Sequence, residues 1–137
     1  MPLEISSATL STAGILLIAI VAVEWGGTYM LALARGRRSA TPFQITFSRA
    51  GHAHAGVLVI LALVAQLYVD ASGASGVFGS IAREGIPLAA ILMPLGFFLS
   101  SAGKDRTRPS ALIWLLYIGA ICLAAGVLAL GVALLTA

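Results

Sequence analysis

Long apolar runs separated by short polar segments dominate this chain. The runs cover residues 10–34, 50–69, 85–102 and 111–136, and each reaches or approaches the ~20 residues that a helix needs to cross a ~30 Å hydrocarbon core. A segment that crosses lipid must satisfy its backbone hydrogen bonds internally, so we expect each run to be a helix. The pattern therefore predicts an all-α membrane protein in which residues 1–137 form a single integral membrane domain.

Composition supports this interpretation and excludes an ordinary soluble domain. Apolar residues make up 60% of the chain and charged residues only 9%, whereas a typical soluble domain carries about 25% charged residues. The sequence also lacks a Ser-His-Asp set, a phosphate-binding glycine loop and a paired carboxylate constellation. We therefore do not expect the chain to be an enzyme on its own.

The basic residues predict an orientation. Seven of the eight lie beside or between the apolar runs on one side: Arg35, Arg37, Arg38 and Arg49 before the second run, and Lys104, Arg106 and Arg108 before the fourth. Short loops rich in Lys and Arg stay in the cytoplasm. Together with the short connections, this predicts an antiparallel four-helix bundle, N-out and C-out, in the cell (inner or plasma) membrane. Topology explains the net charge of +3, so no nucleic-acid partner is expected.

Glu24 is the acidic residue that fits least well in an apolar run. A carboxyl group deep in a span costs a few kcal/mol and usually faces the bundle interior or a wet cavity. This predicts a proton or solute site at Glu24, with Thr28 one turn further along and His52 or Gln66 of the second run assisting. A proton-coupled transporter of a small solute is the corresponding functional hypothesis. The other reading is a protonated carboxyl that hydrogen-bonds a neighbouring helix.

The segment Glu24-Trp25-Gly26-Gly27-Thr28 resembles the first helix of small multidrug resistance transporters. In that family a membrane-buried Glu followed by a Gly-Thr pair binds protons and cationic drugs alternately, so the resemblance implies a similar role for Glu24. The similarity covers these five residues. The third run lacks the Trp-containing, Gly-rich motif of that family, and the histidine segment of this chain has no counterpart there.

Two histidines, His52 and His54, begin the second run within a Gly-His-Ala-His-Ala-Gly segment. Residues two apart on a helix point about 200° apart, so both cannot grip one ion from the same face. Helical phase predicts that His52 points inward, on the face that carries Gln66, and that His54 is more peripheral. Aromatic residues are expected at a similar depth in the inner leaflet, namely Tyr29, Phe97, Phe98, Trp114 and Tyr117.

These inner-leaflet side chains have two interpretations. One is an ordinary interfacial aromatic belt. The other is a pocket for a flat cofactor, haem b or a quinone, with His52, His54, Tyr29, Trp114 and Tyr117 as candidate binding residues. For haem, His52 or His54 would be the axial ligand, alone or paired with a His of a second subunit. This cofactor site in a membrane subunit with an accessory role in electron transfer is the leading hypothesis for function.

Small residues predict how the helices associate, because close approach drives helix packing in lipid. The fourth run carries a stripe of them, Gly119, Cys122, Gly126, Ala129 and Ala133. Such faces serve either packing within the chain or contact with other chains. The expected partners are therefore the lipid bilayer and either further copies of this chain or other membrane subunits. A structural or assembly subunit of a larger membrane complex is the third functional hypothesis.

Overall fold

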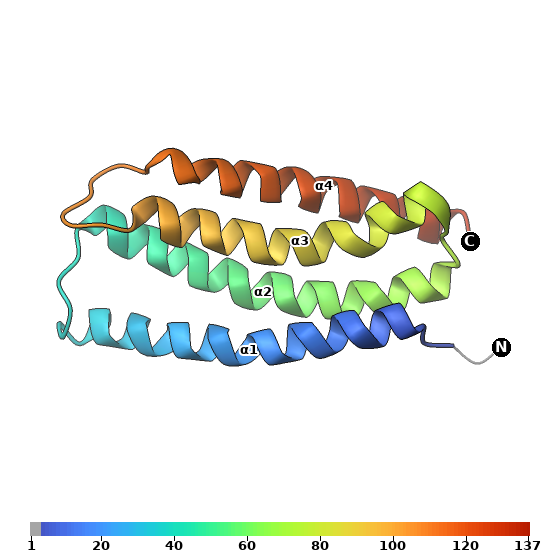
Figure 1. Cartoon of the computed structure of the whole chain (residues 1–137), viewed down its shortest axis with the longest axis horizontal. Coiled ribbons are helices and arrows are strands. Elements are labelled where there is room, and N and C mark those ends of the chain that lie inside the picture. Colours follow the sequence, from blue (N-terminus) through green and yellow to red (C-terminus); the bar gives the residue numbers. More distant parts are fainter. Residues whose placement is uncertain (1–3) are drawn as a thin grey trace.

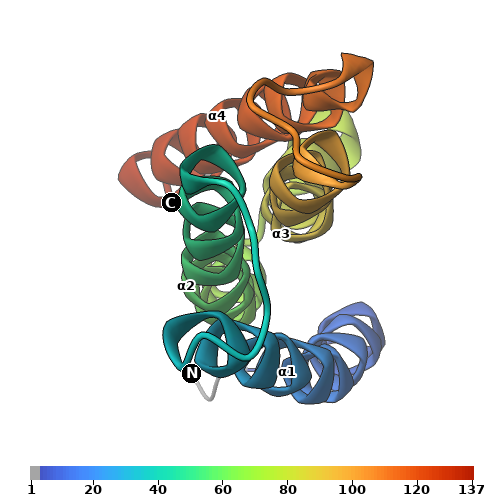
Figure 2. The same ribbon diagram turned by 90° about the vertical axis from the view of Figure 1, so that its left-hand side faces the viewer.

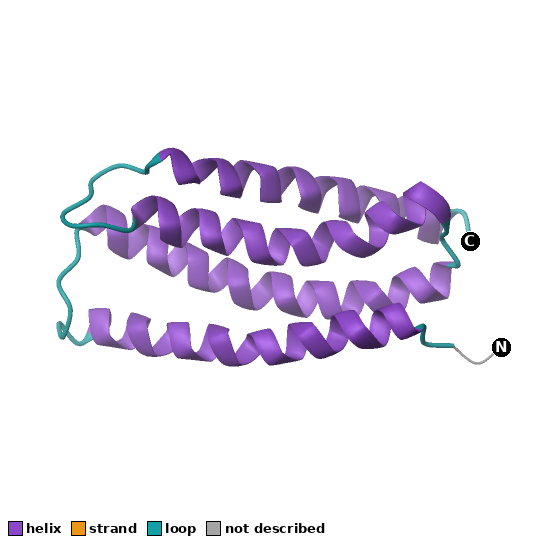
Figure 3. Ribbon diagram, viewed as in Figure 1, coloured by secondary structure: helices purple, strands orange, loops and turns teal. Residues whose placement is uncertain are grey.

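The computed structural model describes residues 4–137, and all regular structure in that range is helical (Figure 3). It contains four long helices, α1 (Ser7–Ala34), α2 (Pro42–Ser72), α3 (Gly76–Ser101) and α4 (Trp114–Leu135), the last preceded by a short 3₁₀ turn at Ala111–Ile113. Each is long and apolar enough to cross a membrane. The prediction of an all-helical chain with four helices of spanning length is confirmed.

Helices α2 and α3 begin eight and nine residues earlier than the apolar runs predict, and the N-terminal cap of α2 explains its early start. The side chain of Thr41 accepts a hydrogen bond from Gln44 N and that of Gln44 accepts one from Thr41 N, with Pro42 at the first turn. This capping box starts α2 eight residues before the run at 50–69. The outer connection, expected to span residues 70–84, shrinks to residues 73–75, where Gly73 ends α2 with a φ of 65°.

The connections divide the molecule into two ends (Figure 1). The loops after α1 and after α3 lie at one end, here called the basic end because it carries the Arg and Lys residues of both loops. The turn between α2 and α3, the start of α1 and the C-terminus lie at the other end, here called the terminal end. This arrangement places both basic segments together, as the charge pattern requires of loops on one side of a membrane.

The helices do not contribute equally to the core. Helix α3 packs against both α2 and α4, whereas α1 lies beside α2 on the side away from α4 (Figure 2). Only Thr9 and Leu16 of α1 are buried, compared with twelve residues of α3. Most of the surface of α1 is therefore left uncovered in the single chain.

Glycines allow α3 and α4 to approach closely. A Cβ atom added to Gly85 would lie 2.7 Å from the Cα atom of Gly126, and one added to Gly96 would lie 2.4 Å from the backbone N of Leu116. Within the small-residue stripe of α4, Gly119, Gly126, Ala129 and Ala133 are buried and Cys122 is half-buried. In this chain the glycines of the stripe serve packing within the monomer, because their contacts are on α3.

At the terminal end, a partly buried ion pair and its partners connect three helices. We call Ser6, Thr9, Gln66, Asp70 and Arg83 the polar tie. Arg83 Nη2 lies 2.6 Å from Asp70 Oδ1, while Arg83 Nη1 donates to Thr9 Oγ1 at 2.6 Å and to Gln66 Oε1 at 3.2 Å. The Ser6 N–H and hydroxyl donate to the Asp70 carboxylate at 2.9 and 3.0 Å. The polar tie thus fixes the start of α1 to α2 and α3.

Pro87 explains why Gln66 belongs to the polar tie. A proline inside a helix has no N–H for the carbonyl four residues earlier, which here is the carbonyl of Arg83. Gln66 Nε2 donates to that carbonyl at 2.8 Å, and the Gln66 side chain is fully buried. A polar side chain of α2 therefore repairs the backbone hydrogen bond that Pro87 removes from α3.

Candidate functional site

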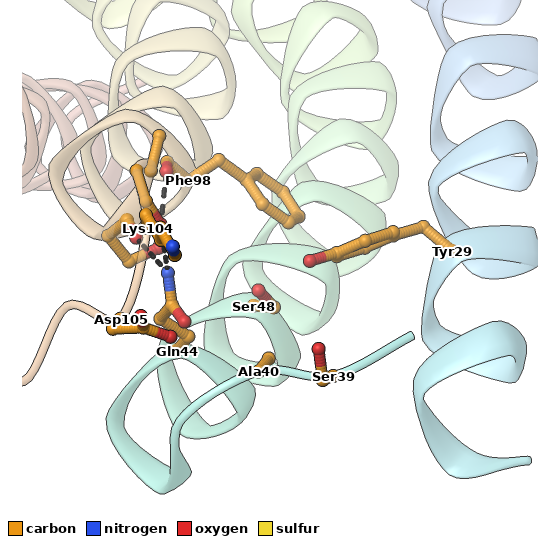
Figure 4. Close-up of a pocket in the computed structure, with 11 residues that line it drawn as sticks. Tyr29, Ser39, Ala40, Gln44, Ser48, Phe98, Lys104 and Asp105 are labelled. Carbon is orange, nitrogen blue, oxygen red and sulfur yellow. Dashed lines mark hydrogen bonds between the residues drawn. The ribbon is translucent and has the colours of Figure 1, made fainter. Parts of the chain in front are cut away.

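A polar cavity of about 480 Å³ opens at the basic end, where α1, α2, α3 and the two basic loops meet (Figure 4). We call it the loop pocket. Each helix and each loop contributes to its wall: Tyr29 from α1, Ser39 and Ala40 from the loop that follows it, Gln44 and Ser48 from α2, Phe98 and Ser101 from α3, and residues 102–105 from the loop after α3.

Aromatic rings and hydroxyl groups face the loop pocket together. The Tyr29 ring reaches from α1 with its hydroxyl toward α2, and the Phe98 ring projects from α3 on the opposite side (Figure 4). Ser48, which is buried, and Ser39 bring hydroxyl groups from below the rings. The Arg38 guanidinium, which is not part of the lining, lies 5.8 Å from the centre of the Tyr29 ring and makes a cation–π contact with it.

The Gln44 side chain lines the loop pocket and connects its walls through three hydrogen bonds. Its Nε2 donates to the carbonyl oxygens of Ser101 at 3.0 Å and Gly103 at 2.7 Å, while its Oε1 accepts the Thr41 N–H. The Thr41 hydroxyl donates to the carbonyl of Arg106. These bonds hold the loop after α3 against the start of α2, so the shape of the cavity depends on contacts between the loops and α2.

The lining of the loop pocket contains one basic and one acidic residue, so it carries no net formal charge. Lys104 and Asp105 both belong to the wall, and no other charged residue does. The wider basic end is strongly positive, but the cavity itself presents one cation and one anion. This lining suits a neutral polar group better than a phosphate or another anion.

His52 lies deeper along α2, one turn beyond Ser48, and packs on α1. A Cβ atom added to Gly27 would lie 3.5 Å from His52 Cε1, and one added to Gly26 would lie 3.6 Å from Nδ1. The imidazole therefore rests against the two adjacent glycines of α1. The His52 residue is half-buried, so it does not occupy the centre of the molecule as helical phase predicted.

His54 faces α3 instead. Its Nδ1 lies 2.7 Å from the carbonyl oxygen of Ala50, and its ring centre lies 5.0 Å from that of Phe97. Because a carbonyl only accepts, this contact requires a proton on Nδ1. His54 is half-buried like His52, and the predicted difference in burial between them is absent. Ala53, His54, Val57 and Leu58 line a small cavity of about 170 Å³.

The residues expected to form a proton or solute site lie apart. Glu24 and Thr28 are exposed on α1, and the Thr28 hydroxyl donates to the Trp25 carbonyl within its own helix. Gln66 belongs to the polar tie, where its carbonyl accepts from Thr9 at 3.4 Å. Thr9 precedes Glu24 by fifteen residues, or about 22 Å along α1. The structure therefore does not bring Glu24 and Gln66 together.

Of the five predicted cofactor-binding residues, Tyr29 alone lines the loop pocket. Trp114 and Tyr117 lie on the outer surface of α4, 66% and 49% exposed, with their rings 5.4 Å apart. Sequence reasoning missed Gln44 and Ser48, which precede the apolar run at 50–69. Gln44, Ser48 and His52 are spaced four residues apart, which places them near one face of a helix. This spacing is the feature of the sequence that could have indicated a polar site there.

No three His, Cys, Asp or Glu side chains gather as a metal site within residues 4–137. Comparison of the chain with protein-family models, with curated proteins and with solved structures gives no match.

Proposed function

We propose that this chain is a quinone-binding subunit of the cell membrane, an antiparallel bundle with N-out and C-out topology that serves an electron-transfer partner. The observation that carries this proposal is the loop pocket, a cavity of about 480 Å³ between the Tyr29 and Phe98 rings. Its volume falls within the range of about 300–1,000 Å³ that small-molecule sites occupy. The positive-inside rule places it in the inner leaflet.

The chemistry of the lining favours a quinone head group. A quinone is a flat, uncharged ring with two carbonyl oxygens, and it carries an apolar tail that lies in lipid. Aromatic side chains stack on flat rings, and the hydroxyls of Tyr29 and Ser48 donate to carbonyl oxygens. The balanced charges of Lys104 and Asp105 disfavour an anionic lipid head group as the ligand.

The amount of quinone that co-purifies with the protein tests this proposal. Purified in mild detergent and extracted with organic solvent, the wild-type protein should yield quinone, whereas Ala40→Phe, which fills the loop pocket from its half-buried wall residue, should yield little. Ala71→Phe, an exposed position on α2 at the terminal end, is the matched control and should retain it. Equal quinone content in both variants would place any bound quinone outside the loop pocket.

The proposed topology predicts a labelling pattern. In a Cys122→Ala background, Ser75→Cys in the short turn after α2 should react with an impermeant maleimide added to intact cells. Ser39→Cys in the loop after α1 should react only after the membrane is opened, because Arg35, Arg37 and Arg38 hold that loop inside. Labelling of Ser39→Cys in intact cells would contradict N-out and C-out topology.

The hydrogen bond made by the His54 side chain supports haem as a second candidate ligand. A hydrogen bond from Nδ1–H to a backbone carbonyl orients many metal-bound histidines and leaves Nε2 to ligate, and His54 has this bond to Ala50. The cavity beside it, about 170 Å³, is below the usual range for a ligand site, so a haem would need a second subunit to complete the site. A visible spectrum with a Soret band, lost in His54→Ala and kept in His52→Ala, would support this candidate.

A further inference from the structure

The outward surface of α1 carries a carboxyl group where lipid would otherwise contact the single chain. Glu24 is exposed, and so is the neighbouring Trp25, at 77%. Glu24 precedes the end of α1 at Ala34 by ten residues, or about 15 Å of helix, which is half the thickness of a hydrocarbon core. A carboxyl facing lipid at that depth is energetically unfavourable and usually has a polar partner. This face of α1 therefore requires a protein neighbour.

The exposed surface of α1 contains two stripes with a seven-residue repeat, and one of them includes Glu24. We call the seven residues of that stripe the α1 seam, and their spacing alternates between four and three: Leu10, Gly14, Leu17, Val21, Glu24, Thr28 and Leu31. Six of the seven are exposed, and Gly14 is half-buried with nothing within 4 Å of an added Cβ atom. A repeat of this kind forms a continuous stripe that packs against a second helix with the same repeat.

The residue types on the α1 seam favour a parallel pair. Leu10, Leu17, Glu24 and Leu31 occupy the d positions of the repeat, and Gly14, Val21 and Thr28 occupy the a positions. Leucine at d with β-branched residues at a favours two parallel strands, and membrane helices commonly cross at the same angle as coiled coils. A second copy inserted in the same orientation presents a parallel α1 at the same depth.

We propose that two copies of this chain pair through the α1 seam, about a twofold axis along the membrane normal, with Glu24 of each copy facing Glu24 of the other. In such an interface each residue on the axis meets its own counterpart. The carboxylic acid group can donate a hydrogen bond from its O–H and accept one at its carbonyl oxygen, so two facing carboxyls can satisfy each other. This hydrogen bond supplies the partner that Glu24 lacks in the monomer and makes Glu24 the residue that sets the register.

Cysteine cross-linking in native membranes tests the pairing and does not depend on the quinone proposal. In a Cys122→Ala background, Leu17→Cys on the α1 seam should shift most of the protein to a disulfide-linked dimer on mild oxidation. Ile15→Cys, on the opposite flank of α1, should remain monomeric even though Ile15 and Leu17 are 67% and 57% exposed. Leu10→Cys provides a second seam position if one variant accumulates poorly.

Glu24 variants provide the second arm of the experiment. In the Leu17→Cys protein, Glu24→Gln should keep the dimer band because paired amides also hydrogen-bond, and Glu24→Ala should weaken it. Equal cross-linking at Ile15 and Leu17, or none at both Leu17 and Leu10, would overturn the proposal. A cross-link from Leu17 to a protein of different mass would assign the α1 seam to another subunit and would overturn it equally.

Discussion

Replacing Asp70 with alanine should destabilise the protein more than any other single change at the terminal end. Removal of the carboxylate leaves the Arg83 guanidinium without its ion-pair partner and the Ser6 N–H without its acceptor. The Asp70 and Arg83 side chains are 5% and 19% exposed. Breaking a fully buried ion pair from one side costs about 3–5 kcal/mol, and the partial exposure of Arg83 places the expected cost at the lower end of that range. Reversible unfolding in mixed detergent micelles should show a loss of this size.

Two further variants separate the ion pair from a general effect of charge. Glu84→Ala removes an exposed carboxyl at the same end and should leave the free energy of unfolding nearly unchanged. Asp70→Leu combined with Arg83→Met removes both charges and should recover part of the stability, because no charge is left unpaired. A loss for Asp70→Ala no larger than that for Glu84→Ala would show that the polar tie does not hold α1 in place.

Gly126→Val should separate α3 from α4. A Cβ atom at Gly126 would lie 3.0 Å from Gly85 Cα and 3.0 Å from Ile86 N, which are backbone atoms that cannot move aside without shifting a helix. Overpacking of this kind costs about 1–3 kcal/mol, and occasionally more. The same unfolding measurement should detect the loss.

Gly131→Val is the matched control for the α3–α4 interface. Gly131 lies on the same helix, is exposed, and has nothing within 4 Å of an added Cβ atom. Valine there should be tolerated. If both valine variants unfold alike, the lost stability belongs to the helix itself rather than to its contact with α3.

The helices were predictable from sequence because hydropathy and length decide them, and three of the four end within one residue of the predicted run, but the starts of α2 and α3 were not predicted. The start of α2 depends on the Thr41–Gln44 capping box, which lies in a stretch of mixed polarity before the apolar run. The turn between α2 and α3 is short because residues 76–84 continue as helix despite Arg83 and Glu84. Average hydropathy does not register such local hydrogen bonds or the polar tie that shelters Arg83.

Partners of the polar residues were harder to foresee than the helices. Gln66 was expected to assist Glu24, but Pro87 on another helix leaves a free carbonyl that Gln66 satisfies. Trp114 was expected at a pocket because its depth fits, yet depth does not determine which way a side chain points. The loop pocket depends on how α1 and two loops pack against α2, which helical phase on a single element does not specify.

Equilibrium binding of a short-chain quinone to the purified protein tests the central claim most directly. Tyr29→Phe removes only the hydroxyl that faces the loop pocket, and the loss of a hydrogen bond worth about 0.5–1.5 kcal/mol should raise Kd about 2- to 10-fold. Tyr68→Phe removes the hydroxyl of an exposed tyrosine near the other end of α2 and should leave Kd unchanged. An unchanged Kd for Tyr29→Phe, or equal changes for both variants, would contradict binding of the quinone head group in the loop pocket.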